Sequence, residues 1–210
     1  MAEQRELHEP FHQPERQAEA DRLGMLVFLG SEAMLFGGIF AAALALRFLH
    51  PQEFVSASSH MKLWHGTLNT AVLLTSSLMA AIAVEAARSG RRRSAGRALW
   101  GAVASALVFL AVKAHEYWLE YREGVIPGLP NAHFTSGFEQ LFMNLYFAAT
   151  GLHALHLVVG MVLLGIAAIN RRAREDRRAV LIGNVALYWH LVDLVWIFLY
   201  PTIYLAGAGE

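Results

Sequence analysis

Ionisable side chains stand inside apolar stretches of this sequence, where they could hold protons, metal ions or lipid head groups. The stretch NVALYWHLVDLVWIFLYPTIYLAG (184–207) is apolar enough to cross a membrane, yet it carries His190 and Asp193 three residues apart. On a helix, this spacing puts both side chains on one face. The imidazole N–H can donate to the carboxylate, which satisfies both groups in an apolar setting. We expect this pair to fix a helix contact, with water or a lipid head group as a possible third partner.

Two further histidines, His153 and His156, also share one helical face. They could ligate a metal ion or haem, or they could hydrogen bond to a neighbouring helix or a lipid phosphate. We favour hydrogen bonding, because axial haem ligands approach from opposite sides of the ring and adjacent turns of one helix cannot supply them. The Glu-x-x-His pattern of metal sites in helix bundles is also absent from every apolar stretch.

Lys113, Glu116 and Tyr117 form a third group on one face of a helix. A Lys–Glu pair costs less free energy to hold in or near lipid than either charge alone. Trp118 and Tyr121 follow closely, and aromatic residues of this kind gather where a helix leaves the bilayer. The pattern therefore predicts an ion pair at the membrane surface, with the lysine reaching toward water.

Glu32 differs from these groups because no opposite charge lies within four residues of it. A lone carboxyl group in an apolar setting tends to keep its proton. The residue can therefore take part in proton movement, or it can serve as a neutral acid that hydrogen bonds across a helix interface. The sequence leaves both interpretations open.

The elements that position these groups follow from length and hydropathy. Of the 210 residues, 56% are hydrophobic and 16% are charged, against roughly 25% charged in a typical soluble domain. A membrane-spanning helix needs about 20 mostly apolar residues. Five stretches meet this requirement: 23–48, 63–87, 98–119, 138–169 and 180–206. We therefore predict an all-α polytopic membrane bundle over residues 23–210, preceded by a polar arm over residues 1–22.

The basic residues predict how the bundle is oriented. With five spans, the arm and the second and fourth connections share one side of the membrane and carry 13 of the 17 Lys and Arg residues, while the other side carries 3. Connections rich in Lys and Arg remain in the cytoplasm. We predict a cytoplasmic N-terminus and a periplasmic C-terminus in a bacterial inner membrane. Candidate contacts to anionic lipid are Arg91, Arg92, Arg93, Arg171 and Arg172.

Small residues recur at every fourth position of the first span, at Ala33, Gly37, Ala41 and Ala45. Such a stripe lets another helix approach closely. We interpret it as a packing surface.

Composition excludes several classes of function. The chain has no cysteine, which rules out thiolate zinc sites, iron–sulfur clusters and thiolate-bridged copper in this chain. The formal net charge is zero and the basic residues are spread among the connections, so no basic face for nucleic acid is predicted.

Five motifs, one in each span, together resemble subunit III of the haem–copper respiratory oxidases. They are SEAMLFGGIF (31–40), LNTAVLLTSS (68–77), KAHEY (113–117), GLHALHLVVG (151–160) and YWHLVDLVWIFLY (188–200). The last two are the most specific. The resemblance extends from about residue 23 to residue 206, and the five spans are similar to the shorter form of the family.

The resemblance implies a subunit that carries no haem or copper itself and packs against the catalytic subunit I, which holds both. It implies bound phospholipid in a cleft, which lies here between the first span and the other helices or is built partly by a neighbouring subunit. It also implies support of proton uptake and of stability during turnover. By motif match, Glu32 is the family's reactive intramembrane acid. The resemblance leaves open whether the electron donor is cytochrome c or quinol.

Three alternatives remain at this stage. The shorter form also occurs as an accessory subunit of nitric oxide reductase. A small proton or solute transporter would use Glu32, His190 and Asp193 as a relay, although no internal repeat supports it. A haem or di-metal enzyme would draw its ligands from His65, His115, His153, His156 and His190.

Overall fold

A computed structural model describes residues 14–59, 61–128, 134, 136–170 and 175–207. All regular secondary structure in these residues is α-helical. The helices are α1 (Pro14–Leu49), α2 (Pro51–Ser59), α3 (Leu63–Arg88), α4 (Arg92–Glu123), α5 (Gly137–Ile169) and α6 (Glu175–Ile203). Five of them, all except α2, are long and apolar enough to cross a membrane. The predicted all-α architecture with five spans is confirmed.

Two of the helix ends carry capping groups that the sequence supplies. The side chain of Ser136 accepts a hydrogen bond from the backbone N–H of Glu139 at 3.1 Å, which caps the start of α5. Gly124 ends α4 in the left-handed conformation, with φ of 70°. Glycine adopts this conformation without strain, which makes it a common helix terminator.

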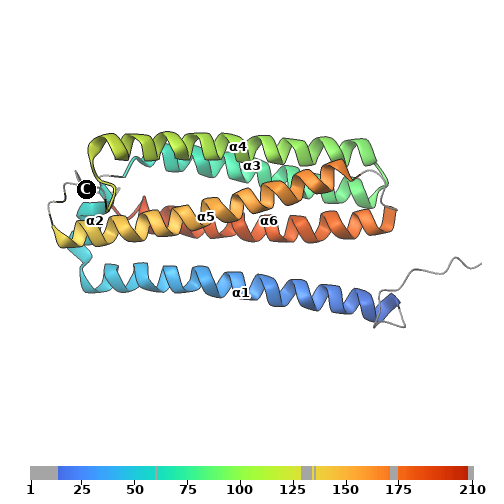
Figure 1. The fold of residues 1–210 in the computed structure, drawn as a ribbon, viewed down its shortest axis with the longest axis horizontal. Helices are drawn as coiled ribbons and strands as arrows, with labels where there is room; N and C mark the ends of the chain where they lie inside the picture. Colours follow the sequence, from blue (N-terminus) through green and yellow to red (C-terminus); the bar gives the residue numbers. More distant parts are fainter. Residues whose placement is uncertain (1–13, 60, 129–133, 135, 171–174, 208–210) are drawn as a thin grey trace, which may run out of the picture.

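The long helices run side by side, and α1 lies along one edge of the bundle (Figure 1). It packs against α5 and α6, whereas α3 and α4 pair at the opposite edge. Among the residues of α1 whose side chains are described, only Phe36 and Ala43 are buried. The core therefore lies among α3, α4, α5 and α6, and α1 is an outlying helix.

The small-residue stripe of α1, interpreted from the sequence as a packing surface, is not used within the described part of this chain. Ala33, Gly37, Ala41 and Ala45 are all exposed, and nothing lies within 4 Å of the position that a Cβ atom on Gly37 would occupy. The stripe does not pack against another described helix of this chain. Larger side chains make the contact instead, including Phe28 on Tyr188 and Phe40 on Phe198.

The short helix α2 was not expected, because residues 51–59 lie between the first two predicted spans. Proline is well tolerated at the first position of a helix, where its missing N–H costs nothing. Phe54 of α2 is buried against Phe142 of α5, with ring centroids 5.1 Å apart. Ser58 donates a hydrogen bond to the backbone carbonyl of Ile203 at 2.6 Å. These contacts join α2 to the ends of α5 and α6.

Candidate functional site

The largest polar cluster surrounds Lys113 of α4. Its ammonium group donates to Glu116 Oε2 at 3.1 Å, to the Tyr146 hydroxyl at 2.9 Å and to the Tyr204 hydroxyl at 2.5 Å. Lys113 is 2% exposed and Glu116 is 0% exposed. The predicted ion pair is present, but the lysine does not reach toward water as predicted. The pair is enclosed by α4, α5 and the C-terminal end of α6.

Three members of this cluster were missed in the sequence: Glu120, Tyr146 and Tyr204. Glu120 is 4% exposed, and one of its oxygens lies 2.7 Å from the Tyr146 hydroxyl. The sequence could have predicted the place of Glu120, because it follows Glu116 by four residues and so lies on the same helical face. The two tyrosines come from other helices and carried no comparable signal.

Tyr117 also lies beside the cluster, as its spacing predicted. Its hydroxyl is within 2.6 Å of Thr150 Oγ1 on α5, and the Lys113 ammonium lies 5.2 Å from its ring centroid. The electron-rich face of an aromatic ring attracts an ammonium ion. The same ammonium nitrogen lies 4.6–5.6 Å from the ring centroids of Tyr146, Trp196 and Tyr204.

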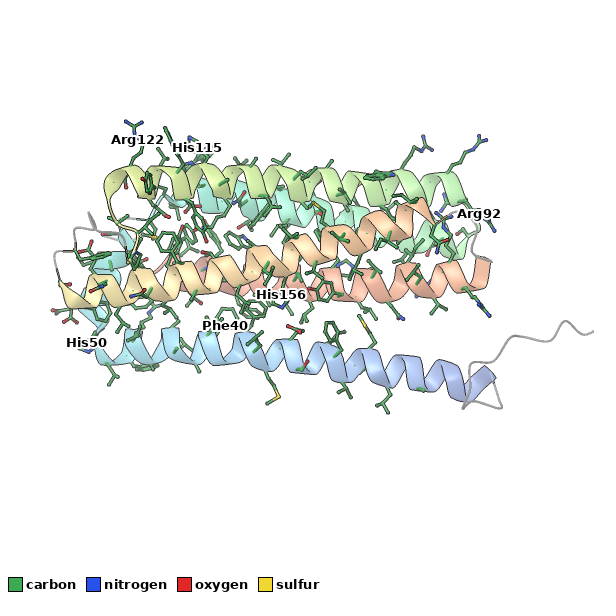
Figure 2. The ribbon with its side chains drawn as sticks, in the orientation of Figure 1. Phe40, His50, Arg92, His115, Arg122 and His156 are labelled. Carbon is green, nitrogen blue, oxygen red and sulfur yellow. The ribbon has the colours of Figure 1, made fainter. Side chains whose placement is uncertain are left out.

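The second site joins the outlying helix α1 to the bundle. Glu32 Oε2 lies 2.7 Å from His156 Nε2, and the other ring nitrogen of His156 lies 2.8 Å from the backbone carbonyl of Leu152. Both side chains are mostly buried, at 18% and 14% exposed. Figure 2 shows His156 on the side of the bundle that faces α1. The acid that had no partner on its own helix therefore has a basic partner on α5.

His153 does not share this contact, although it stands on the same helix three residues earlier. It is 0% exposed, and neither ring nitrogen has a hydrogen-bond partner. Its ring packs against Phe109 and Trp196, with centroids 5.6 Å and 5.2 Å away. The preference for hydrogen bonding is correct for His156 and wrong for His153.

The predicted hydrogen bond between His190 and Asp193 is also wrong. His190 Nδ1 lies 2.8 Å from Ser77 Oγ on α3, so the histidine fixes a helix contact through a serine. Asp193 is 3% exposed, and neither carboxyl oxygen has a hydrogen-bond partner. The spacing of His190 and Asp193 correctly predicted a shared face of α6. It could not predict that His190 would hydrogen bond to a serine of α3.

The remaining histidines of the metal-enzyme interpretation lie in separate places. His65 and His115 stack on each other across α3 and α4, with 3.3 Å between the nearest ring nitrogens. In the part of the chain that the structure describes, no group of three or more His, Asp or Glu side chains could hold a metal ion.

Three consecutive arginines lie where α3 connects to α4: Arg91 precedes α4, and Arg92 and Arg93 are its first two residues. Arg92 lies at the opposite end from Arg122 and His50 (Figure 2). Arg91, Arg92 and Arg93 are exposed. Arg171 and Arg172, the other predicted lipid contacts, lie outside the described residues.

Comparison with known proteins assigns this arrangement to a family. The family model described as "Cytochrome c oxidase subunit III" matches residues 12–208. The chain belongs to the cytochrome c oxidase subunit III family. The resemblance noted in the five motifs is thereby confirmed, and the chain is a multi-pass membrane protein of that family.

Several relatives in this family match over most of the chain. Cytochrome c oxidase subunit 3 of Thermostichus vulcanus is 31% identical over 87% of this chain and 86% of its own length. The protein of the same name from Latimeria chalumnae is 30% identical over 89% of this chain and 70% of its own length. A haem–copper oxidase subunit I+III of Aeropyrum pernix is 31% identical over 88% of this chain and 22% of its own length. In that relative, the subunit III region is one part of a much longer chain.

Proposed function

We propose that this protein is the non-redox accessory subunit of a haem–copper terminal oxidase, which reduces oxygen to water and moves protons across the membrane. The match to the subunit III family over residues 12–208 carries this proposal. Its partner is subunit I, which binds the haem and copper. The Aeropyrum relative supports this choice, because its name places I and III in one chain.

We also propose that phospholipid covers the outlying helix. Much of the apolar surface of α1 is exposed, including Leu35 at 48% and Leu44 at 48%. Apolar surface of this kind requires either hydrocarbon or another protein around it. The exposed Arg91, Arg92 and Arg93 supply positive charge for anionic head groups at one end of the bundle.

The distribution of arginines supports an orientation. Arg92 marks the basic end, which includes the α3–α4 connection (Figure 2). By the positive-inside rule this end faces the cytoplasm. The N-terminus is then cytoplasmic and the C-terminus periplasmic, in a bacterial inner membrane.

The complex can be identified by purifying it in mild detergent through a tag on this chain. We expect a haem-bearing subunit I to co-purify, with a redox difference spectrum that identifies its haems and metal analysis that finds copper. Co-purification of a haem subunit with non-haem iron and no copper would assign the chain to a nitric oxide reductase instead. A colourless chain that purifies alone would contradict the accessory role.

Glu32 provides a test of the role in turnover. We propose that the Glu32–His156 pair, 2.7 Å apart, supports proton uptake by the partner subunit. Glu32→Ala should leave co-purification of subunit I intact but shorten the time for which the oxidase remains active during turnover. The matched control is Glu85→Ala, which removes an exposed acid of α3. Loss of the whole complex in Glu32→Ala alone would show that the residue is purely structural.

A further inference from the structure

The cluster around Lys113 contains two carboxyl groups and one ammonium group in a space without solvent. Glu116, Glu120 and Lys113 are 0%, 4% and 2% exposed. If both acids were ionised, the cluster would carry one uncompensated negative charge. An unpaired buried charge is costly in a protein interior and more so within a membrane.

Among the residues that the structure describes, no second cation is hydrogen bonded to the cluster, although Lys62 is near enough to interact with Glu120 through space. On α4, Tyr117 is hydrogen bonded to Thr150, and on α5, His153 packs between Phe109 and Trp196. Lys62, at the start of α3, is already paired with Glu123, with 2.7 Å between Nζ and Oε1. The charge of the cluster therefore has to be balanced within it.

The hydrogen bonds give an independent measure of how many protons the cluster holds. Lys113 Nζ has three contacts: Glu116 Oε2, the Tyr146 hydroxyl and the Tyr204 hydroxyl. The Tyr204 hydroxyl lies 2.8 Å from Glu116 Oε1. The Tyr146 hydroxyl lies 2.7 Å from Glu120 Oε1 and 3.0 Å from Glu116 Oε1. These six contacts are 3.1 Å or shorter, and each requires one hydrogen atom if no hydrogen is shared between two acceptors. A seventh approach, between the hydroxyls of Tyr204 and Tyr146, is longer at 3.5 Å.

With both acids ionised, the cluster has too few hydrogen atoms for these contacts. An ammonium group supplies three and each phenol supplies one, which gives five. Tyr146 has a single hydrogen, so it cannot donate to Glu116 and to Glu120 at once. A sixth hydrogen on one carboxyl group satisfies all six contacts of 3.1 Å or less, and the same proton neutralises the cluster.

The contacts also indicate which acid holds this proton. Glu116 accepts from the Lys113 ammonium and from two phenols, a setting that stabilises a carboxylate. Glu120 touches only the Tyr146 hydroxyl, and its Oε2 has no hydrogen-bond partner. We infer that Glu120 is a proton-binding site that is occupied at neutral pH. Its O–H donates to Tyr146, which in turn donates to the ionised Glu116.

Infrared spectroscopy of the tagged complex, or of the full chain, tests this inference. The difference spectrum of the native protein minus Glu120→Gln should contain the carbonyl stretch of one carboxylic acid and should show no loss of carboxylate bands. Glutamine is a suitable replacement because its amide N–H can still donate to Tyr146. The control is Glu123→Gln, at a side chain 56% exposed on the same helix, which should remove carboxylate bands only. Loss of carboxylate bands in Glu120→Gln would overturn the inference.

A second variant keeps the test decisive if Glu120→Gln fails to assemble. Tyr146→Phe removes the hydroxyl that accepts from Glu120 and leaves the acid in place. The carboxylic acid band should then shift to higher frequency, because a free acid carbonyl absorbs above a hydrogen-bonded one. A spectrum of Tyr146→Phe in which no acid band moves would show that the proton is not at this hydroxyl and would contradict the assignment.

Discussion

Replacing Lys113 with methionine should lower the free energy of unfolding by about 3–5 kcal/mol, the usual cost of removing one partner of a buried ion pair. Methionine fills a similar volume, so the main loss is the positive charge. Glu116, which is 0% exposed, would lose its ammonium partner at 3.1 Å and be left without a compensating positive charge. The measurement is the unfolding midpoint of the purified chain in detergent, followed by a denaturant titration.

A matched control and a compensating variant separate charge from packing. Lys62→Met breaks a more exposed pair, with side chains 26% and 56% exposed, and should cost about 0–1 kcal/mol. Adding Glu116→Gln to Lys113→Met should recover part of the lost stability, because the stranded acid is then neutral. If Lys113→Met were as mild as Lys62→Met, the ammonium would not be the charge partner of the cluster.

The sequence was sufficient to predict the spans, because hydropathy and length alone define a membrane helix. The polar groups within the spans were also visible, since each interrupts an apolar stretch. The hydrogen-bond partners of these polar groups could not be predicted, because the partners lie on other helices. Glu32 meets His156 across 124 positions of sequence, and Ser77 meets His190 across 113. Spacing along one helix cannot report contacts of that kind.

The same limit explains the errors over Asp193 and Lys113. Positions three apart on a helix share a face whether or not they bond to each other. His190 bonds to Ser77 on α3 and not to Asp193. Lys113 was expected to reach toward water because aromatic residues typical of a membrane surface follow it. The actual reason for its burial is Tyr146 and Tyr204, which close over it from α5 and from the C-terminal end of α6.

The packing of α5 on α6 depends on a close approach at Gly160. A Cβ atom at this position would lie 2.7 Å from Cε3 and 2.9 Å from Cζ3 of Trp189, and 3.3 Å from Cε1 of Tyr188. Trp189 is 0% exposed, so its ring has little room to move. The hydroxyl of Tyr188 also donates to the backbone carbonyl of His156 at 3.2 Å, so this contact helps to place the helix that holds His156.

Gly160→Ala should therefore destabilise the protein by about 1–3 kcal/mol, the usual cost of overpacking a core. The matched control is Gly165→Ala on the same helix, where nothing lies within 4 Å of the added Cβ atom. That control should keep or slightly raise stability, because alanine favours a helix by roughly 1 kcal/mol over glycine. Unfolding midpoints of the two variants, measured together in one detergent, make the comparison. Equal midpoints would mean that α5 and α6 can separate without cost at Gly160, and that Trp189 does not set their spacing.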